Sequence, residues 1–193
     1  MNILNVGYDS TIYYILADSK LHLLIDIGFP GTLPKLQHQL KRAGIQLADI
    51  KHLLATHYHP DHAGLAQELK RLGMKLIVVD IQLSAIPVMK LQMKPSYNYV
   101  DIDLKDNLVI TLADSRAFLA KLGIQGEIIA TPGHSDDSVT LITDDGAAFT
   151  GDLTPPIMAG ENNMLAIQHS WEAIRTHGAK IIYPGHGPSH KLE

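Results

Sequence analysis

Four side chains that commonly bind metals lie within positions 57–62, and this cluster constrains the chain more than any other feature. The pattern, His-x-His-x-Asp-His, begins after Thr56, where residues 50–55, a candidate for a buried strand, end. The spacing places His57, His59 and Asp61 on one side of an extended loop, unlike the helical His-Glu-x-x-His motif, and His62 begins a helix. Because crowded imidazoles and a carboxylate are costly to desolvate alone, the pattern predicts a loop curved around a metal cation.

Three further residues of the same type stand where predicted strands end. His134 follows Thr-Pro-Gly, Asp152 follows Thr-Gly, and His186 lies within Pro-Gly-His-Gly. A glycine beside each residue lets the backbone turn sharply as it leaves a sheet. Because loops at strand ends usually carry the chemistry of layered α/β proteins, we expect all seven side chains to meet at one edge. The other histidines are interpreted as ordinary surface residues: His22, His38, His52, His169, His177 and His190.

Strand-like and helix-like segments alternate along the chain in two similar halves. The apolar patterns predict strands at residues 11–17, 21–27, 50–55, 75–79, 108–112, 126–131, 139–143, 147–150 and 181–183. Amphipathic spacing and stop residues predict helices at residues 34–43, 62–72, 115–122 and 164–177. Turns are predicted at residues 18–20 and 144–146. We therefore expect two halves packed face to face, with sheets inside and helices outside.

Residues 84–99 lack a clean period and contain several methionine, proline and tyrosine residues. Two interpretations are open for this segment, a mobile lid over a site or an irregular, partly buried crossover. Together with Tyr183, it is a candidate for the wall of a substrate pocket.

The composition favours a globular chain that acts on a small molecule. Hydrophobic residues make up 46% and charged residues 19% of the 193 residues, and we expect one domain over 1–193. The apolar runs are too short to cross a membrane, and the first ten residues lack a secretory pattern. The absence of cysteine fits a cytoplasmic protein. A net charge of −4 without a dense basic cluster argues against a nucleic-acid partner, and the oligomeric state is left open.

Taken in this order, the motifs resemble those of the metallo-β-lactamase-fold hydrolases, from about Leu21 to Gly187. Residues 24–28 are also similar to the family's early Asp-x-Gly turn. The resemblance implies an α+β fold, a four-layer αββα sandwich. Glyoxalase II-type thiolester hydrolases resemble the chain most, through Thr-His-x-His-Pro-Asp-His, Thr-Pro-Gly-His, Thr-Gly-Asp and Pro-Gly-His-Gly. Those enzymes carry a C-terminal helical domain that is absent from this sequence, so a smaller ester, thiolester or lactone is expected.

The resemblance also implies roles for the ligand-type residues. It assigns two metal triads and one bridging residue: His57, His59 and His134; Asp61, His62 and His186; and Asp152. A metal-bound hydroxide would attack a carbonyl carbon, with Asp61 and Asp152 as the catalytic carboxylates and Asp61 orienting the hydroxide. A ligand set without sulfur suits two divalent ions. Zinc is the metal we expect, and iron or manganese would also suit these ligands.

Two aspartate positions near the ligands each have two interpretations. Asp26 either fixes a ligand histidine from behind or simply forms the turn before Gly28. Asp136 and Asp137 depart from the Thr/Ser-x-Gly-Ser pattern usual in thiolesterases. They either act on charged substrates or cap the turn into the next strand, and we favour the cap.

Other branches of the same family suggest other reactions. Persulfide dioxygenases use one iron held by residues that match His57, His134 and Asp152, so an iron oxidoreductase is the main alternative to a dinuclear hydrolase. β-Lactamases differ at several ligands, and lactonases carry a tyrosine near the bridging aspartate where this chain has residues 153–156. Diiron flavoproteins place glutamate at the position of His59. Metal binding without catalysis is a third hypothesis.

Overall fold

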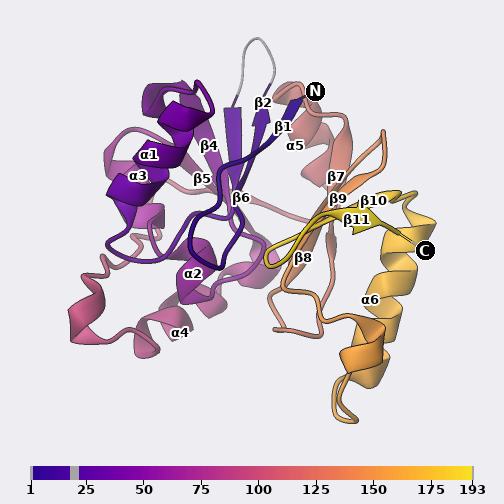
Figure 1. The fold of residues 1–193 in the computed structure, drawn as a ribbon. Coiled ribbons are helices and arrows are strands. Elements are labelled where there is room, and N and C mark those ends of the chain that lie inside the picture. The colour runs from indigo at the N-terminus through magenta and orange to yellow at the C-terminus, as the bar shows by residue number, and fades with distance from the viewer. Residues whose placement is uncertain (1, 18–21, 193) are drawn as a thin grey trace.

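Two β-sheets stand at the centre of the computed structural model, which describes residues 2–17 and 22–192 (Figure 1). The first sheet has the strand order β1 (Asn2–Asn5), β2 (Tyr14–Ala17), β3 (His22–Ile25), β4 (Ile50–Leu54), β5 (Lys75–Val79) and β6 (Leu108–Ile110). The second has the order β11 (His190–Lys191), β10 (Ile181–Pro184), β9 (Ala147–Gly151), β8 (Val139–Thr143) and β7 (Gly126–Ala130). Strands β3 to β6 pair in parallel, as do β9 and β10, and the other pairs are antiparallel.

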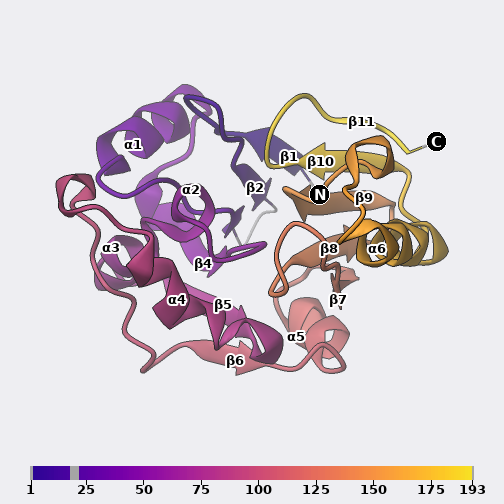
Figure 2. The same ribbon diagram turned by 90° about the horizontal axis from the view of Figure 1, so that it is seen from below.

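Helices cover the outer faces of both sheets (Figure 2). The α-helices are α1 (Leu33–Arg42), α2 (Pro60–Ala63), α3 (Ala66–Arg71), α4 (Ala85–Leu91), α5 (Ser115–Lys121) and α6 (Met164–Thr176). Short 3₁₀ turns are η1 (Leu47–Asp49), η2 (Asp80–Gln82), η3 (Pro95–Tyr97) and η4 (Pro156–Met158). Helices α1 and α3 pack on the first sheet, and α6 packs on the second.

Three apolar cores separate the four layers. Neighbouring residues of one strand point to opposite faces, so Leu24 joins the core under α1 and α3, while Leu23 and Ile25 join the core between the sheets. Phe149 of the second sheet points into this central core. Trp171 of α6 packs on the opposite, outer face of the second sheet. The order helix, sheet, sheet, helix confirms the predicted αββα sandwich.

The helix predicted over residues 62–72 is wrong as a single element. It begins earlier, at Pro60, and is broken into α2 and α3 around Gly64. A Cβ at Gly64 would lie 2.3 Å from Pro30 Cδ, so the neighbouring loop packs directly on the backbone there. The short edge strands β1 and β11 are not predicted from the sequence. The predicted turn at residues 18–20 lies outside the described residues.

Residues 84–99 form a crossover between the parallel strands β5 and β6, in agreement with the second interpretation of this segment. They contain α4 and η3, and Ile86 and Met89 are buried in the core next to α3. Among the described residues, no helix combines the length and apolar character needed to span a membrane.

Candidate metal centre

The loops that carry the seven predicted ligands meet at one end of the two sheets. The loop after β4 supplies His57 and His59, and α2, into which it leads, supplies Asp61 and His62. One further ligand follows each of β7, β9 and β10. The residues form two groups of donor atoms, one of three histidines and one of two aspartates and two histidines. The members are His57, His59 and His134 in the first group and Asp61, His62, Asp152 and His186 in the second.

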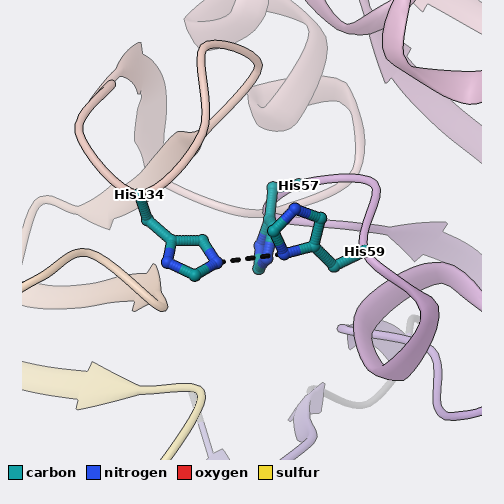
Figure 3. A group of neighbouring side chains, drawn as sticks. All are labelled: His57, His59 and His134. Carbon is teal, nitrogen blue, oxygen red and sulfur yellow. Dashed lines mark hydrogen bonds between the residues drawn. The ribbon is translucent and has the colours of Figure 1, made fainter. Parts of the chain in front are cut away.

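The first group consists of three imidazole rings that face one another (Figure 3). The ring centres of His57 and His59 are 4.5 Å apart, and each lies 4.8 Å from the ring centre of His134. His134 Nε2 and His59 Nδ1 are only 3.0 Å apart. The geometry therefore directs ring nitrogens from two separate loops at one point.

His57 is the most enclosed of the three rings. Its Nδ1 lies 3.2 Å from Thr56 Oγ1, while its buried Nε2 has no hydrogen-bond partner among the described residues. Burial, together with the neighbouring His62, His59 and His134, holds the pKa of His57 well below its usual value. The pKa of His134 is also lowered, mainly by burial. Both rings are therefore neutral at pH 7 and have a lone pair available for a cation.

The second group contains four side chains whose donor atoms lie within 4.8 Å of one another. His62 Nε2 lies 3.4 Å from Asp61 Oδ2 and 3.2 Å from Asp152 Oδ1. His186 Nε2 lies 3.3 Å from Oδ2 of each aspartate. Donors at the corners of a tetrahedron with typical zinc bond lengths would be about 3.3 Å apart. These four distances agree with the donor spacing around a small tetrahedral cation, and Asp152 offers a different oxygen to His62 and to His186.

Asp152 lies between the two groups. Its Oδ2 is 3.3 Å from His186 Nε2 in the second group and 3.7 Å from His134 Nε2 in the first. Burial raises the pKa of the Asp152 carboxyl, but contacts with His62, His186 and His134 outweigh burial and lower it overall. The carboxylate is therefore ionised at neutral pH and faces both groups.

Asp26 supports the second group from behind. It is buried, and its Oδ2 lies 2.9 Å from His62 Nδ1, which leaves His62 Nε2 directed at the other donors. Its Oδ1 accepts hydrogen bonds from the backbone N–H and the hydroxyl of Thr56. Burial lowers the pKa of His62, but the surrounding carboxylates outweigh burial and raise it well above its usual value. These contacts favour the first interpretation of Asp26, that it fixes a histidine.

Residues near the N-terminus also fix the second group, and the sequence does not reveal them. Thr11 Oγ1 donates a hydrogen bond of 2.9 Å to Asp61 Oδ2, and Ser10 O lies 2.6 Å from His186 Nδ1. Contacts with His62 and Thr11 outweigh burial and lower the pKa of Asp61. A short loop with one serine and one threonine carries no spacing signal, so only the folded structure identifies these contacts.

A glycine is required beside the second group. A Cβ on Gly185 would lie 2.5 Å from Asp152 Oδ1 and 2.6 Å from His62 Cε1, which is closer than real Cβ contacts. The Pro-Gly-His-Gly pattern therefore has a steric reason at this position, since any side chain there would displace the donors.

Gln82 and Asp137 join the loop of the first group to the neighbouring elements. Asp137 Oδ2 accepts a hydrogen bond of 2.8 Å from the backbone N–H of Tyr58, between His57 and His59. The fully buried Gln82 side chain donates to the backbone oxygens of Ala55, Thr56 and Asp137. Asp137 thus supports the histidine loop in addition to lying in a turn, whereas Asp136 is exposed.

Replacing Gln82 with alanine is expected to lower the free energy of unfolding by about 2 kcal/mol, because buried carbonyl groups would lose their donor. Chemical denaturation of the metal-free protein measures this change. The matched control is Gln37→Ala on the exposed side of α1, expected to change stability by less than about 0.5 kcal/mol. Equal effects of the two substitutions would show that the Gln82 contacts do not hold the loop.

Comparisons with known proteins give a family model, curated relatives and solved structures to which this chain is similar. A family model described as the metallo-beta-lactamase superfamily matches residues 6–186. A "Beta-lactamase-like protein 2 homolog" from Drosophila melanogaster is 27% identical over 90% of this chain and 57% of its own length. An "Atrochrysone carboxyl ACP thioesterase" from Aspergillus fumigatus is 29% identical over 90% of this chain and 50% of its own length.

A bacterial relative and a solved structure extend the comparison. A "Hydroxyacylglutathione hydrolase" from Rhodopseudomonas palustris is 28% identical over 83% of this chain and 54% of its own length. The chain therefore spans about half the length of these curated relatives. The crystal structure of the metallo-beta-lactamase MIM-1 from Novosphingobium pentaromativorans superposes with a TM-score of 0.73 at 19% identity, covering 96% of this chain and 73% of that one.

Proposed function

Because the chain belongs to the metallo-beta-lactamase superfamily, we propose that it is a metal-dependent hydrolase of a small ester, thiolester or lactone. The proposed centre holds two divalent ions, zinc in our proposal, one in each donor group. The observation that carries the proposal is the position of Asp152, which lies within 4 Å of histidine nitrogens from both groups. Two adjacent donor groups that share a carboxylate are the arrangement that a dinuclear centre needs.

Bound metal ions would satisfy the donor atoms better than their contacts with one another do. Buried His57 Nε2 has no hydrogen-bond partner among the described residues, which is costly unless a cation binds it. Buried His62 Nε2 and Asp152 Oδ1 contact each other at 3.2 Å within the second group. The set of imidazole nitrogens and carboxylate oxygens, without sulfur, suits zinc. When bound, the ions would lower the pKa of a water molecule and polarise a substrate carbonyl.

The residues around the donors have distinct tasks in the proposed reaction. Hydrolysis forms a bond from the water oxygen to the carbonyl carbon, breaks the bond to the leaving sulfur or oxygen, and delivers a proton to that atom. Asp61 is held by Thr11 and stays ionised, so it can accept a hydrogen bond from the attacking water and orient it. Asp26 and Asp137 position the histidines and touch no substrate.

A thiolester is favoured among the possible substrates. Two relatives have names that specify a thioesterase and a hydroxyacylglutathione hydrolase. The relatives are longer than this chain, so we propose only the chemical class and not their particular substrates.

A substrate screen tests the proposal. Thiolesters, lactones and phosphodiesters should be assayed with the native protein and with His59→Ala, whose ring lies within the first donor group. We expect a thiolester or lactone to be hydrolysed, and we expect kcat/KM to fall at least a hundredfold in the variant, or about 3 kcal/mol. His38→Ala, which changes an exposed histidine on α1, should match the native protein. If His59→Ala matched it on every substrate, the proposed role of this ring would fail.

A further inference from the structure

A pocket of about 780 Å³ opens beside the metal centre, on the outer face of the second sheet. Its lining includes the candidate ligands His134, Asp152 and His186, and it continues between η4, α6 and the strands β10 and β11. Figure 2 shows α6 beside β8 and β9, with β10 and β11 beyond them. Of the described residues, neither Tyr183 nor any in the range 84–99, the predicted pocket wall, lines this pocket. One continuous space therefore joins the metal centre to the part of the sheet beyond α6.

The floor of the pocket consists of alternate residues of β10 and of the segment around β11. Ile182 of β10 belongs to the core under α6 and pairs with His190. Because paired residues share one face of a sheet and neighbours alternate, His190 and Leu192 lie on the same side as Ile182. Lys191 also borders the pocket, but its side chain lies on the opposite face, and Arg175 already has an interaction within the protein. Neither cation is therefore assigned to a ligand, and the floor presents mainly apolar side chains.

The side walls of the pocket are apolar as well. Leu153 and Trp171 line it and belong to the same core as Ile182. Trp171 Nε1–H donates a hydrogen bond of 2.9 Å to Thr154 O, so the polar atom of the ring is already satisfied within the wall. Asp152, beside the metal centre, is the only carboxylate among the described lining residues. Because a charge is costly to bury without a partner, these walls favour an uncharged apolar group.

The turn η4 adds exposed apolar side chains at the rim of the pocket. Ile157 is 95% exposed and Met158 is 72% exposed, and Met158 also lines the pocket. Exposed apolar side chains beside an apolar groove are typical of a site where a ligand covers them. The rim therefore extends the apolar surface that a bound molecule can contact.

The apolar surface is long enough for an extended chain. Leu192 N–H donates a hydrogen bond to Lys180 O, just before β10, whereas Pro184 at the other end of β10 leads into the loop that carries His186. Four residue steps along the strand separate Lys180 from Pro184, or about 13 Å. A group that starts at the metal centre would therefore reach Leu192 only if it were elongated.

We propose that this pocket holds an uncharged apolar chain of the ester or thiolester, about 10 Å long, which runs from the scissile bond at the metal centre towards Leu192. Trp171 and Ile182 contact the middle of the chain, and Met158 covers it from the rim. The inference rests on the proposed hydrolase function, and it adds the substrate class. The chain belongs to the acyl group or to the leaving thiol, and the experiment distinguishes these two sources.

Two series of thiolesters test the dependence on chain length. The first varies the acyl group from acetyl through hexanoyl to octanoyl on ethanethiol, and the second keeps acetyl and varies the thiol from ethanethiol through hexanethiol to octanethiol. An extended octanoyl chain is about 9 Å long. We expect kcat/KM to rise at least about a hundredfold along one series and to change less than about threefold along the other. The series that rises identifies the source of the chain, whereas a rise along both series or along neither would overturn the inference.

Binding can be measured without catalysis, because Trp171 is the only tryptophan and lines the pocket. The probes are trifluoromethyl ketones with a butyl or an octyl chain, which have a carbonyl group but no leaving group. Tryptophan fluorescence of the metal-loaded protein gives each Kd. Leu192→Glu places a carboxylate at the far end of the pocket, so it should weaken binding of the octyl probe about tenfold and of the butyl probe less than about threefold. Met158→Glu, at the rim, should weaken binding of the octyl probe about tenfold as well.

The matched control is Leu91→Glu, which places the same charge at an exposed leucine at the end of α4 and should leave both Kd values within about twofold. Circular dichroism should show that all three variants are folded. Unchanged binding in both pocket variants, or no fluorescence change with either probe, would overturn the inference. Binding that is independent of chain length in a protein that light scattering shows to be dimeric would indicate that a second copy covers the pocket, and would overturn it too.

The two experiments together separate this inference from the proposed function. Hydrolysis that does not depend on chain length would overturn the pocket assignment alone. Length-dependent binding of the ketones without hydrolysis of any thiolester would overturn the proposed function while the binding site stands.

Discussion

Replacing Asp152 with alanine is expected to lower kcat for thiolester hydrolysis about a thousandfold or more, which corresponds to roughly 4 kcal/mol of transition-state stabilisation. The reason is that Asp152 is the carboxylate that approaches both donor groups, at 3.3 Å from His186 Nε2 and 3.7 Å from His134 Nε2. Without it, each group loses a negatively charged donor and the histidine nitrogens lose their shared partner. Steady-state kinetics measures the loss, and metal analysis of the same sample should show fewer bound ions.

Asp136→Ala is the matched control for this substitution. It removes the same charge from an exposed position two residues after His134, and kcat should stay within about twofold of the native value. Circular dichroism should show that both variants are folded. If Asp152→Ala retained more than a tenth of the native kcat, a reaction that depends on both donor groups would be excluded.

Replacing Asp26 with alanine is expected to have the largest effect on stability, about 3 kcal/mol of the free energy of unfolding. The substitution removes the buried partner of His62 Nδ1 and two hydrogen bonds from Thr56. The buried imidazole would then lack compensation for its lost hydration. Chemical denaturation of the metal-free protein measures the change. In the metal-loaded protein, affinity at the second group should also fall, by about 10- to 100-fold.

Asp9 provides a close control for Asp26, because both aspartates have a positive φ, 55° and 60°. Alanine is therefore placed in the same unfavourable backbone conformation in both variants. Asp9 is exposed and pairs with the exposed Lys35, so beyond this shared cost its removal should change stability by less than about 1 kcal/mol. Similar losses in Asp9→Ala and Asp26→Ala would show that backbone conformation, and not the His62 contact, determines the effect.

The sequence predicts the positions of the donors because their signals are local. The histidine loop directly follows a strand, and glycine beside Asp152 and His186 indicates that the chain turns where a sheet ends. Such patterns depend on a few neighbouring residues and on the general rule that strand-end loops share an edge. The layered fold follows in the same way from alternating strand and helix periods.

Other features depend on contacts between distant segments, and the sequence does not predict them. Gln82 joins carbonyl groups of two loops, and Thr11 reaches Asp61 across 50 positions. A lone glutamine or threonine has no pattern that identifies such a partner. Pro30 likewise packs against the Gly64 backbone from another loop, a contact that no local pattern identifies. Tertiary packing therefore determines these details.

Metal content per chain, measured on the protein as purified without chelators, tests the proposed dinuclear hydrolase most directly. The two donor groups and the shared Asp152 lead us to expect two zinc ions per chain. One iron ion per chain, together with thiol-dependent oxygen uptake, would contradict the dinuclear hydrolase and indicate oxidation at a single iron.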